Sequence, residues 1–170
     1  MDSYLGLSSL DTPCVVVDEE IMDNNIQRFQ QYCDSHNITL RPHIKTHKIP
    51  ALAHRQLLAG AIGINCQKIS EAEVFADAGI KDILITFNIL GKIKLERLAA
   101  LAKRVKLTVV ADNKETVVQL AAYFREHNSS LSVLVECDTG AQRCGVQTPL
   151  AAQQLAALIG SLVGVTFSGL

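Results

Sequence analysis

The chain has 170 residues, of which 48% are hydrophobic and 19% are charged, and its net charge at neutral pH is -1. This length is typical of a single domain, and the composition excludes a disordered chain. The balanced charge gives no electrostatic support for nucleic-acid binding. No apolar run approaches the roughly 18 residues that cross a bilayer, and we expect no signal peptide. The five cysteines are an odd number without C-x-x-C spacing, which predicts free buried thiols in a cytoplasmic protein.

Short β-rich runs alternate with longer helical patterns along the chain. In chain order the patterns predict a strand at 14–18, a helix at 19–36, a strand at 38–45, a helix at 49–59, a strand at 61–66, a helix at 70–78, a strand at 82–87, a helix at 91–104, a strand at 107–111, a helix at 113–127, a strand at 131–137, a helix at 148–162 and a strand at 163–170. Ser70 with Glu73 predicts a capping box, and Gly60 and Gly79 predict helix ends.

This alternation predicts an α/β fold in which a parallel sheet is connected by helical crossovers. Two architectures are compatible with it, an open doubly wound sheet and a TIM barrel. The chain contains no G-x-G-x-x-G run and no phosphate-binding P-loop motif, as a nucleotide-binding sheet would have. Polar and reactive residues instead recur at the carboxyl ends of successive strands, which is typical of the active face of a TIM barrel.

The densest polar constellation is residues 41–48, with the sequence RPHIKTHK. It is either a solvated basic loop or the end of the strand predicted at 38–45. At a strand end, Lys45 would be partly desolvated and close to other cations, and both effects lower the pKa of an amine. Such a lysine is suited to forming a Schiff base with an aldehyde. Metal binding by His43 and His47 is a rival interpretation, but their spacing suits a helix and not a strand passing into a loop.

This motif resembles the pyridoxal-phosphate lysine motif of the D-threonine aldolase and D-serine dehydratase-like family, relatives of alanine racemase among the fold-type III enzymes. The resemblance extends from about residue 10 to the last residue. Further matching segments occur in the expected order, namely LDTP at 10–13, CQKISEAE at 66–73, GIKDI at 79–83, VECDTG at 135–140 and RCGV at 143–146.

The resemblance implies that Lys45 carries pyridoxal 5'-phosphate as a Schiff base and is the catalytic residue. It also implies that Arg143 contacts the cofactor and that Gln67 faces it from the next strand end. His43 is a further candidate at the cofactor site, where it could orient Lys45. The residues themselves leave alternatives open. Arg143 could form a surface ion pair with Asp138 or Glu136, Gln67 could cap backbone groups, and His43 could be an ordinary hydrogen-bonded histidine. No residue of this chain is assigned to a metal site.

The activity implied by the resemblance is that of a lyase acting on D-3-hydroxy amino acids, by retro-aldol cleavage or by elimination. A divalent metal with ligands outside this chain is expected to bind the substrate hydroxyl. The alternatives are a non-catalytic pyridoxal-phosphate-binding protein and an amino-acid racemase, which would need a second acid/base group.

The resemblance also implies a domain organisation. Residues 1–18 are expected to supply a strand to a β domain completed outside this chain. Residues 19–170 are expected to form about six of the eight units of a pyridoxal-phosphate-binding (β/α)8 barrel. We therefore expect the isolated chain to be an inactive fragment of a protein that forms a homodimer at full length.

Overall fold

The computed structural model describes residues 9–170 and contains one parallel sheet. Its strands are β1 (Ile64–Cys66), β2 (Asp82–Ile85), β3 (Lys106–Ala111), β4 (Leu131–Val135) and β5 (Val165–Phe167). They lie in the order β1-β2-β3-β4-β5, and every neighbouring pair is parallel. A doubly wound sheet reverses its strand order at a switch point, and this sheet does not. The fold is therefore a portion of a (β/α) barrel, as the sequence predicts.

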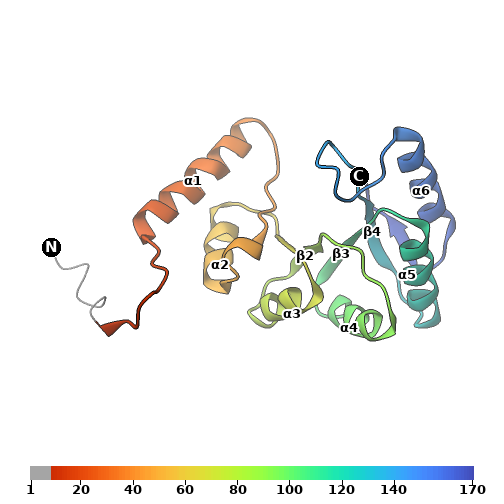
Figure 1. Ribbon diagram of the computed structural model, residues 1–170, viewed down its shortest axis with the longest axis horizontal. Coiled ribbons are helices and arrows are strands. Elements are labelled where there is room, and N and C mark those ends of the chain that lie inside the picture. The colour runs from red at the N-terminus through yellow and green to blue at the C-terminus, as the bar shows by residue number, and fades with distance from the viewer. Residues whose placement is uncertain (1–8) are drawn as a thin grey trace.

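The helices alternate with the strands and begin close to their predicted positions. They are α1 (Glu19–Ser35), α2 (Pro50–Ala59), α3 (Ile69–Asp77), α4 (Lys92–Ala102), α5 (Lys114–Glu126) and α6 (Pro149–Ser161). Figure 1 shows α3 to α6 arranged along one face of the sheet, while α1 packs on α2 beyond its β1 edge. None of the helices in residues 9–170 has the length and apolar character needed to span a membrane.

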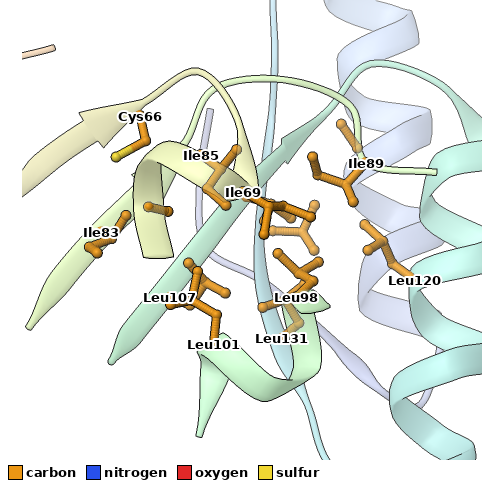
Figure 2. Close-up of a cluster of buried hydrophobic side chains, with 14 of the residues drawn as sticks. Cys66, Ile69, Ile83, Ile85, Ile89, Leu98, Leu101, Leu107, Leu120 and Leu131 are labelled. Atoms are coloured by element: carbon orange, nitrogen blue, oxygen red, sulfur yellow. The ribbon is translucent and has the colours of Figure 1, made fainter. Parts of the chain in front are cut away.

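The hydrophobic core lies between the sheet and these helices (Figure 2). Alternate residues of each strand point into it, so Ile83 and Ile85 of β2 are fully buried while Leu84 between them is only half-buried. Leu98 of α4 and Leu120 of α5 are also fully buried. Each such side chain contributes about 1.5–3 kcal/mol relative to an exposed one. The half-buried face of the sheet is the one that would line the inside of a barrel.

The strand predicted at 38–45 is shorter than expected. Residues 40–43 run parallel to β1, with Ile62 N–H donating to Leu40 O (2.9 Å) and Asn65 N–H to Pro42 O (2.8 Å). The only bridge they form with β1 is at His43. Pro42 has no N–H to donate, so this segment cannot form a complete ladder. The sheet thus consists of five strands and one bridging segment where the sequence predicts six strands.

One predicted helix start is wrong in detail. The capping box expected at Ser70 and Glu73 does not form, because α3 starts at Ile69 with Lys68 in the cap position. Glu73 instead pairs with Arg97 of α4. By contrast, the start of α6 is as predicted, since the Thr148 hydroxyl accepts a hydrogen bond from the Ala151 N–H at 3.1 Å.

The N-terminal segment differs from its prediction as well. Residues 14–18 form no strand in the described part of the chain and are exposed, Val15 to 96%. The helix α1 leaves the apolar Phe29 and Tyr32 exposed and buries only Gln30 and Cys33. Residues 1–8 of the predicted N-terminal segment lie outside the described residues. The assignment of this segment to a separate β domain stays a prediction.

The five cysteines are free, as expected from their number. Cys33 and Cys66 are buried, Cys137 and Cys144 are half-buried and Cys14 is exposed, so the prediction of buried thiols is right for only two of the five. Burial, with a smaller effect of the Glu71 carboxylate, raises the pKa of the Cys66 thiol to about 12. This thiol therefore stays protonated at neutral pH and acts as a small apolar group of the core.

Candidate active site

A cavity of about 470 Å³ opens at the carboxyl ends of the strands. Its lining residues lie at or after the carboxyl end of a strand or of the bridging segment (residues 40–43). They are His43, Lys45, Gln67, Thr86, Phe87, Glu136, Arg143 and Cys144. Because parallel strands present their carboxyl ends at one edge, side chains far apart in sequence meet there. The four residues predicted for the site, His43, Lys45, Gln67 and Arg143, are thus brought to one cavity.

Lys45 lies on a short 3-10 helix, Ile44–Thr46, directly after the bridging residue His43. Ile44 is completely buried and anchors this turn in the core. Its carbonyl accepts hydrogen bonds from the His47 N–H (3.2 Å) and the Lys48 N–H (2.8 Å). Lys45 itself is exposed, so the partial desolvation predicted for a lysine at a strand end is not observed. The turn carries the Lys45 side chain to the wall of the cavity.

His43 is hydrogen-bonded at both ring nitrogens. Its Nδ1 accepts from the Lys45 backbone N–H at 3.2 Å, and its Nε2 lies 3.2 Å from the Thr86 hydroxyl. Burial and the neighbouring Lys45 charge lower the pKa of His43, while the Glu71 carboxylate opposes them. The imidazole is therefore neutral at neutral pH.

Glu71 is the buried acid beneath this part of the site, with only 7% of its surface exposed. One carboxylate oxygen accepts from the Gln67 N–H at 2.9 Å, and the other lies 3.2 Å from Lys48 Nζ. Burial alone would raise the pKa of Glu71, but these two partners outweigh it and hold the pKa below its usual value. Glu71 thereby ties the lysine turn to the loop that carries Gln67.

The loop after β4 closes the other side of the cavity. Cys137 and Val146 form a parallel bridge that brings the two ends of the loop together. Asp138 Oδ1 accepts from the N–H groups of Gly140 (2.9 Å) and Gln142 (3.1 Å). These hydrogen bonds lower the pKa of Asp138. Asp138, one of the two carboxylates near Arg143 in sequence, therefore stabilises the turn at the start of this loop.

Asp112, at the end of β3, fastens this loop to the sheet. Its Oδ2 accepts from the Gly145 N–H and its Oδ1 from the Asn88 side chain, both at 2.9 Å. Burial would raise the pKa of Asp112, but these hydrogen bonds hold it below its usual value. Burial together with the Asp112 charge raises the pKa of Glu136, and Arg143 opposes this shift. The cavity wall thus holds a guanidinium and a carboxyl group whose pKa is raised.

Thr86, Phe87, Glu136 and Cys144 line the cavity although the sequence assigned them no role. Two signals could have found them. Thr86 and Phe87 directly follow an apolar strand, at the end where barrel sites form. Glu136 is an acid that ends the apolar run of β4, within a segment already used for the family resemblance. Cys144 likewise lies within a segment used for the family resemblance, RCGV at 143–146, and the loop that folds back onto Asp112 brings it to the cavity.

Within residues 9–170, no set of three or more His, Cys, Asp or Glu side chains is arranged to hold a metal ion. The rival interpretation of His43 and His47 as metal ligands is not supported, because the Nδ1 atoms of both accept backbone N–H groups. Burial lowers the pKa of His47, opposed by Gln56 and by the Ile49 backbone.

Comparisons with known proteins identify similar chains. The chain is 42% identical over 164 residues to a D-threonine aldolase from an Arthrobacter species, covering 96% of this chain and 43% of that protein. It is 37% identical over 147 residues to a D-threo-3-hydroxyaspartate dehydratase from Delftia sp. strain HT23, covering 85% and 39%. The crystal structure of D-threonine aldolase from Filomicrobium marinum superimposes with a TM-score of 0.92 at 41% identity, covering 96% of this chain and 44% of that one.

The chain thus spans less than half the length of these relatives. These relatives include proteins named as aldolases and a protein named as a dehydratase. Both kinds match most of this chain, 96% and 85% of it. Residues 17–170 match the family described as the alanine racemase N-terminal domain. The chain therefore belongs to the alanine racemase N-terminal domain family, within which it is similar to D-threonine aldolases and D-3-hydroxyaspartate dehydratases.

Proposed function

We propose that the protein is a pyridoxal-phosphate-dependent lyase that acts on D-3-hydroxy amino acids. The observation that carries this proposal is the shared cavity of Lys45, Gln67 and Arg143. The proposal is supported by 42% identity to a protein named D-threonine aldolase. It concerns the activity of the whole protein, because this chain corresponds to only part of its relatives.

The residues of the cavity fit pyridoxal phosphate chemically. The cofactor offers an aldehyde, and Lys45 is a primary amine held on an anchored turn at the cavity wall. It also offers anionic oxygens, for which Arg143 supplies a guanidinium, and an aromatic ring, beside which Phe87 supplies an apolar surface. A volume of about 470 Å³ lies within the range of roughly 300–1,000 Å³ that is usual for ligand sites.

When bound, pyridoxal phosphate supplies an electron sink for negative charge at the substrate α-carbon. Lys45 holds the cofactor through Nζ, and the same atom accepts or returns a proton when the amine is free. Arg143 supplies positive charge at one wall of the cavity. Gln67 offers a neutral amide on a backbone that Glu71 fixes. Neutral His43 adds no second positive charge beside the Lys45 amine, whose nucleophilic form is the neutral one.

The test is reductive trapping with borohydride after addition of pyridoxal phosphate, followed by peptide mapping. We expect the label on Lys45, and we expect Lys45→Arg to abolish it. Lys48→Arg is the matched control, because Lys48 lies in the same loop but pairs with Glu71. The protein translated from the complete reading frame is used, with the 170-residue chain in parallel. A label on another lysine, or none, would show that the proposed role of Lys45 is wrong.

Turnover then separates the possible activities. Release of glycine and an aldehyde from D-threonine identifies an aldolase, whereas release of ammonia and a keto acid from D-serine or D-3-hydroxyaspartate identifies a dehydratase. A labelled Lys45 without turnover of these substrates would favour a non-catalytic cofactor-binding protein, and exchange of amino-acid configuration a racemase. The free thiols fit a cytoplasmic enzyme.

A further inference from the structure

Three neighbouring strand ends are joined beneath Lys45 by a chain of hydrogen bonds. The Lys45 backbone N–H donates to His43 Nδ1 at 3.2 Å. His43 Nε2 lies 3.2 Å from Thr86 Oγ1, at the end of β2. Thr86 Oγ1 in turn donates to the carbonyl of Cys66, the last residue of β1, at 3.2 Å. His43, Lys45 and Thr86 all line the cavity.

The partners at the two ends of this chain determine where its protons lie. A backbone N–H only donates, so His43 Nδ1 must present a lone pair to Lys45. A backbone carbonyl only accepts, so the single proton of the Thr86 hydroxyl points to Cys66 O. The Thr86 oxygen is then free to accept, and His43 Nε2 carries the proton that it accepts. The network is therefore complete only when His43 is neutral and protonated at Nε2.

We propose that His43 is a positioning residue, locked as the Nε2–H tautomer by Thr86, and that its Nδ1 fixes the Lys45 backbone so that the Lys45 amine points into the cavity. This role rests on the proposed function of Lys45 and deepens it. Ile44 anchors the turn from the core side, and His43 holds it from the cavity side. Thr86 acts through His43 and does not itself contact Lys45 in this network.

Protonation of His43 would break the network. A second ring proton would sit on Nδ1 and face the Lys45 N–H, leaving two donors opposed. Several charged groups surround the ring, namely Lys45 on its own segment, Glu71 of α3 with its partner Lys48, and Glu136 with Arg143 on the opposite wall. Burial and Lys45 favour the neutral ring, and Glu71 opposes them. Acidification should therefore release the turn as the ring protonates.

The first test is ¹⁵N NMR of the His43 imidazole in the cofactor-free protein. We expect the shifts of a protonated Nε2 and an unprotonated Nδ1 at neutral pH. In Thr86→Val, which removes the hydroxyl at nearly constant shape, the Lys45 N–H still favours an unprotonated Nδ1, but Nε2 has lost its acceptor, so we expect the Nδ1–H tautomer to become detectable as a minor form. Thr86→Ser should restore the single tautomer. A protonated Nδ1 in the unmodified protein, or an unchanged tautomer in Thr86→Val, would overturn the proposal.

The second test compares two variants of His43 by the rate of reductive trapping at Lys45. His43→Asn keeps an acceptor near the position of Nδ1, so the trapping rate should stay close to that of the unmodified protein. His43→Gln keeps a polar group towards Thr86 but loses that acceptor, so the rate should fall by about threefold to tenfold, as expected for one lost hydrogen bond. Thermal unfolding of both variants checks that they are folded.

The pH profile separates positioning from a merely structural role. Between about pH 7 and pH 5 the trapping rate of the unmodified protein should fall more steeply than that of His43→Asn, which has no ring to protonate. Equal rates and equal pH profiles in all variants, with Lys45 still labelled, would overturn the positioning role and leave the proposed function intact. If Lys45 is never labelled, the proposed function fails, and the NMR result alone decides whether the network exists.

Discussion

At Gly145 the loop after β4 packs closely against its own start, residues 137 and 138. A Cβ atom there would lie 2.5 Å from the Asp138 nitrogen and 2.5 Å from the Cys137 carbonyl carbon, and φ at Gly145 is +99°. Its N–H also donates to Asp112. Any side chain at this position must push the loop, with Arg143 and Cys144, away from the cavity wall.

We expect Gly145→Ala to destabilise the protein more than Gly140→Ala. Gly140 lies in the same loop at φ +121°, but no heavy atom lies within 4 Å of its would-be Cβ. The Gly140 variant thus shows backbone strain alone, which costs roughly 1–3 kcal/mol, and the Gly145 variant adds a steric clash. Urea unfolding measures both. Equal losses would show that the close approach at Gly145 is unimportant.

At the level of single residues, the sequence predicts the site residues that belong to a recognisable motif. Lys45, Gln67 and Arg143 were found from their motifs, and all three line the cavity. Glu71 and Thr86 are not identified, because Glu71 pairs with Lys48 of another element and Thr86 contacts Cys66 and His43, which are 20 and 43 residues away in sequence. The burial that turns Glu71 into an anchor arises only when α3 packs on the sheet, which no local pattern reveals.

Among the elements, α3 has the most direct effect on the site, because its first turn carries Glu71. We expect Glu71→Gln to lower the free energy of unfolding by about 1–3 kcal/mol at neutral pH, since the buried carboxylate that accepts from the Gln67 N–H and pairs with the exposed Lys48 is lost. Glu73→Gln on the same helix is the control. Glu73 pairs with Arg97 at the surface, and such pairs contribute about 0–1 kcal/mol. Chemical denaturation measures the free energy of unfolding of both variants, and the loss should be larger in Glu71→Gln.

The same pair of variants has a pH dependence with a defined sign. The folded-state pKa of Glu71 lies below its ordinary value, so the stability it contributes is present above that ordinary value and is lost as the pH falls through the folded-state pKa. The acid limb of the stability curve should therefore be flatter in Glu71→Gln than in Glu73→Gln. Parallel acid limbs would contradict the assigned role of Glu71.

The sequence predicts element types well and element ends less well. Strong spacing of apolar residues placed all six helices, and Thr148 correctly marked the start of α6. The bridging segment at 40–43 was predicted as a full strand because its apolar residues alternate. Two features shortened it, the missing N–H of Pro42 and the inward turn of the buried Ile44. Tertiary packing at the turn outweighed the local pattern.

Across the whole molecule, the two ends of the sheet have different roles. The carboxyl ends form the cavity, whereas the amino ends carry an ion-pair cluster in which Asp82 contacts Arg41 at 2.7 Å and Lys106 at 2.9 Å. These three residues belong to the bridging segment, β2 and β3, so the cluster ties together the start of the sheet. Burial would raise the pKa of Asp82, but both cations outweigh it and lower that pKa.

Asp82→Asn should therefore reduce stability without changing reductive trapping at Lys45. We expect a loss on the order of 1 kcal/mol at neutral pH, because both ion pairs are only partly buried. This loss should shrink as the pH falls through the folded-state pKa of Asp82, since the carboxylate then protonates in the unmodified protein too. Asp77→Asn, which breaks an exposed pair with Arg104, should change neither property. A change in trapping rate for Asp82→Asn would show that the two ends are coupled.

The sequential order of the strands has a consequence for how the chain is made. Each strand pairs with the one synthesised just before it, as Ile64 pairs with Ile83 and Ile83 with Leu107. No strand has to wait for a partner from a distant part of the chain. The sheet can therefore assemble one β/α unit at a time as the polypeptide leaves the ribosome. The lysine turn lies beside the first strands of the sheet, so on this vectorial route it is assembled before the loop that carries Arg143.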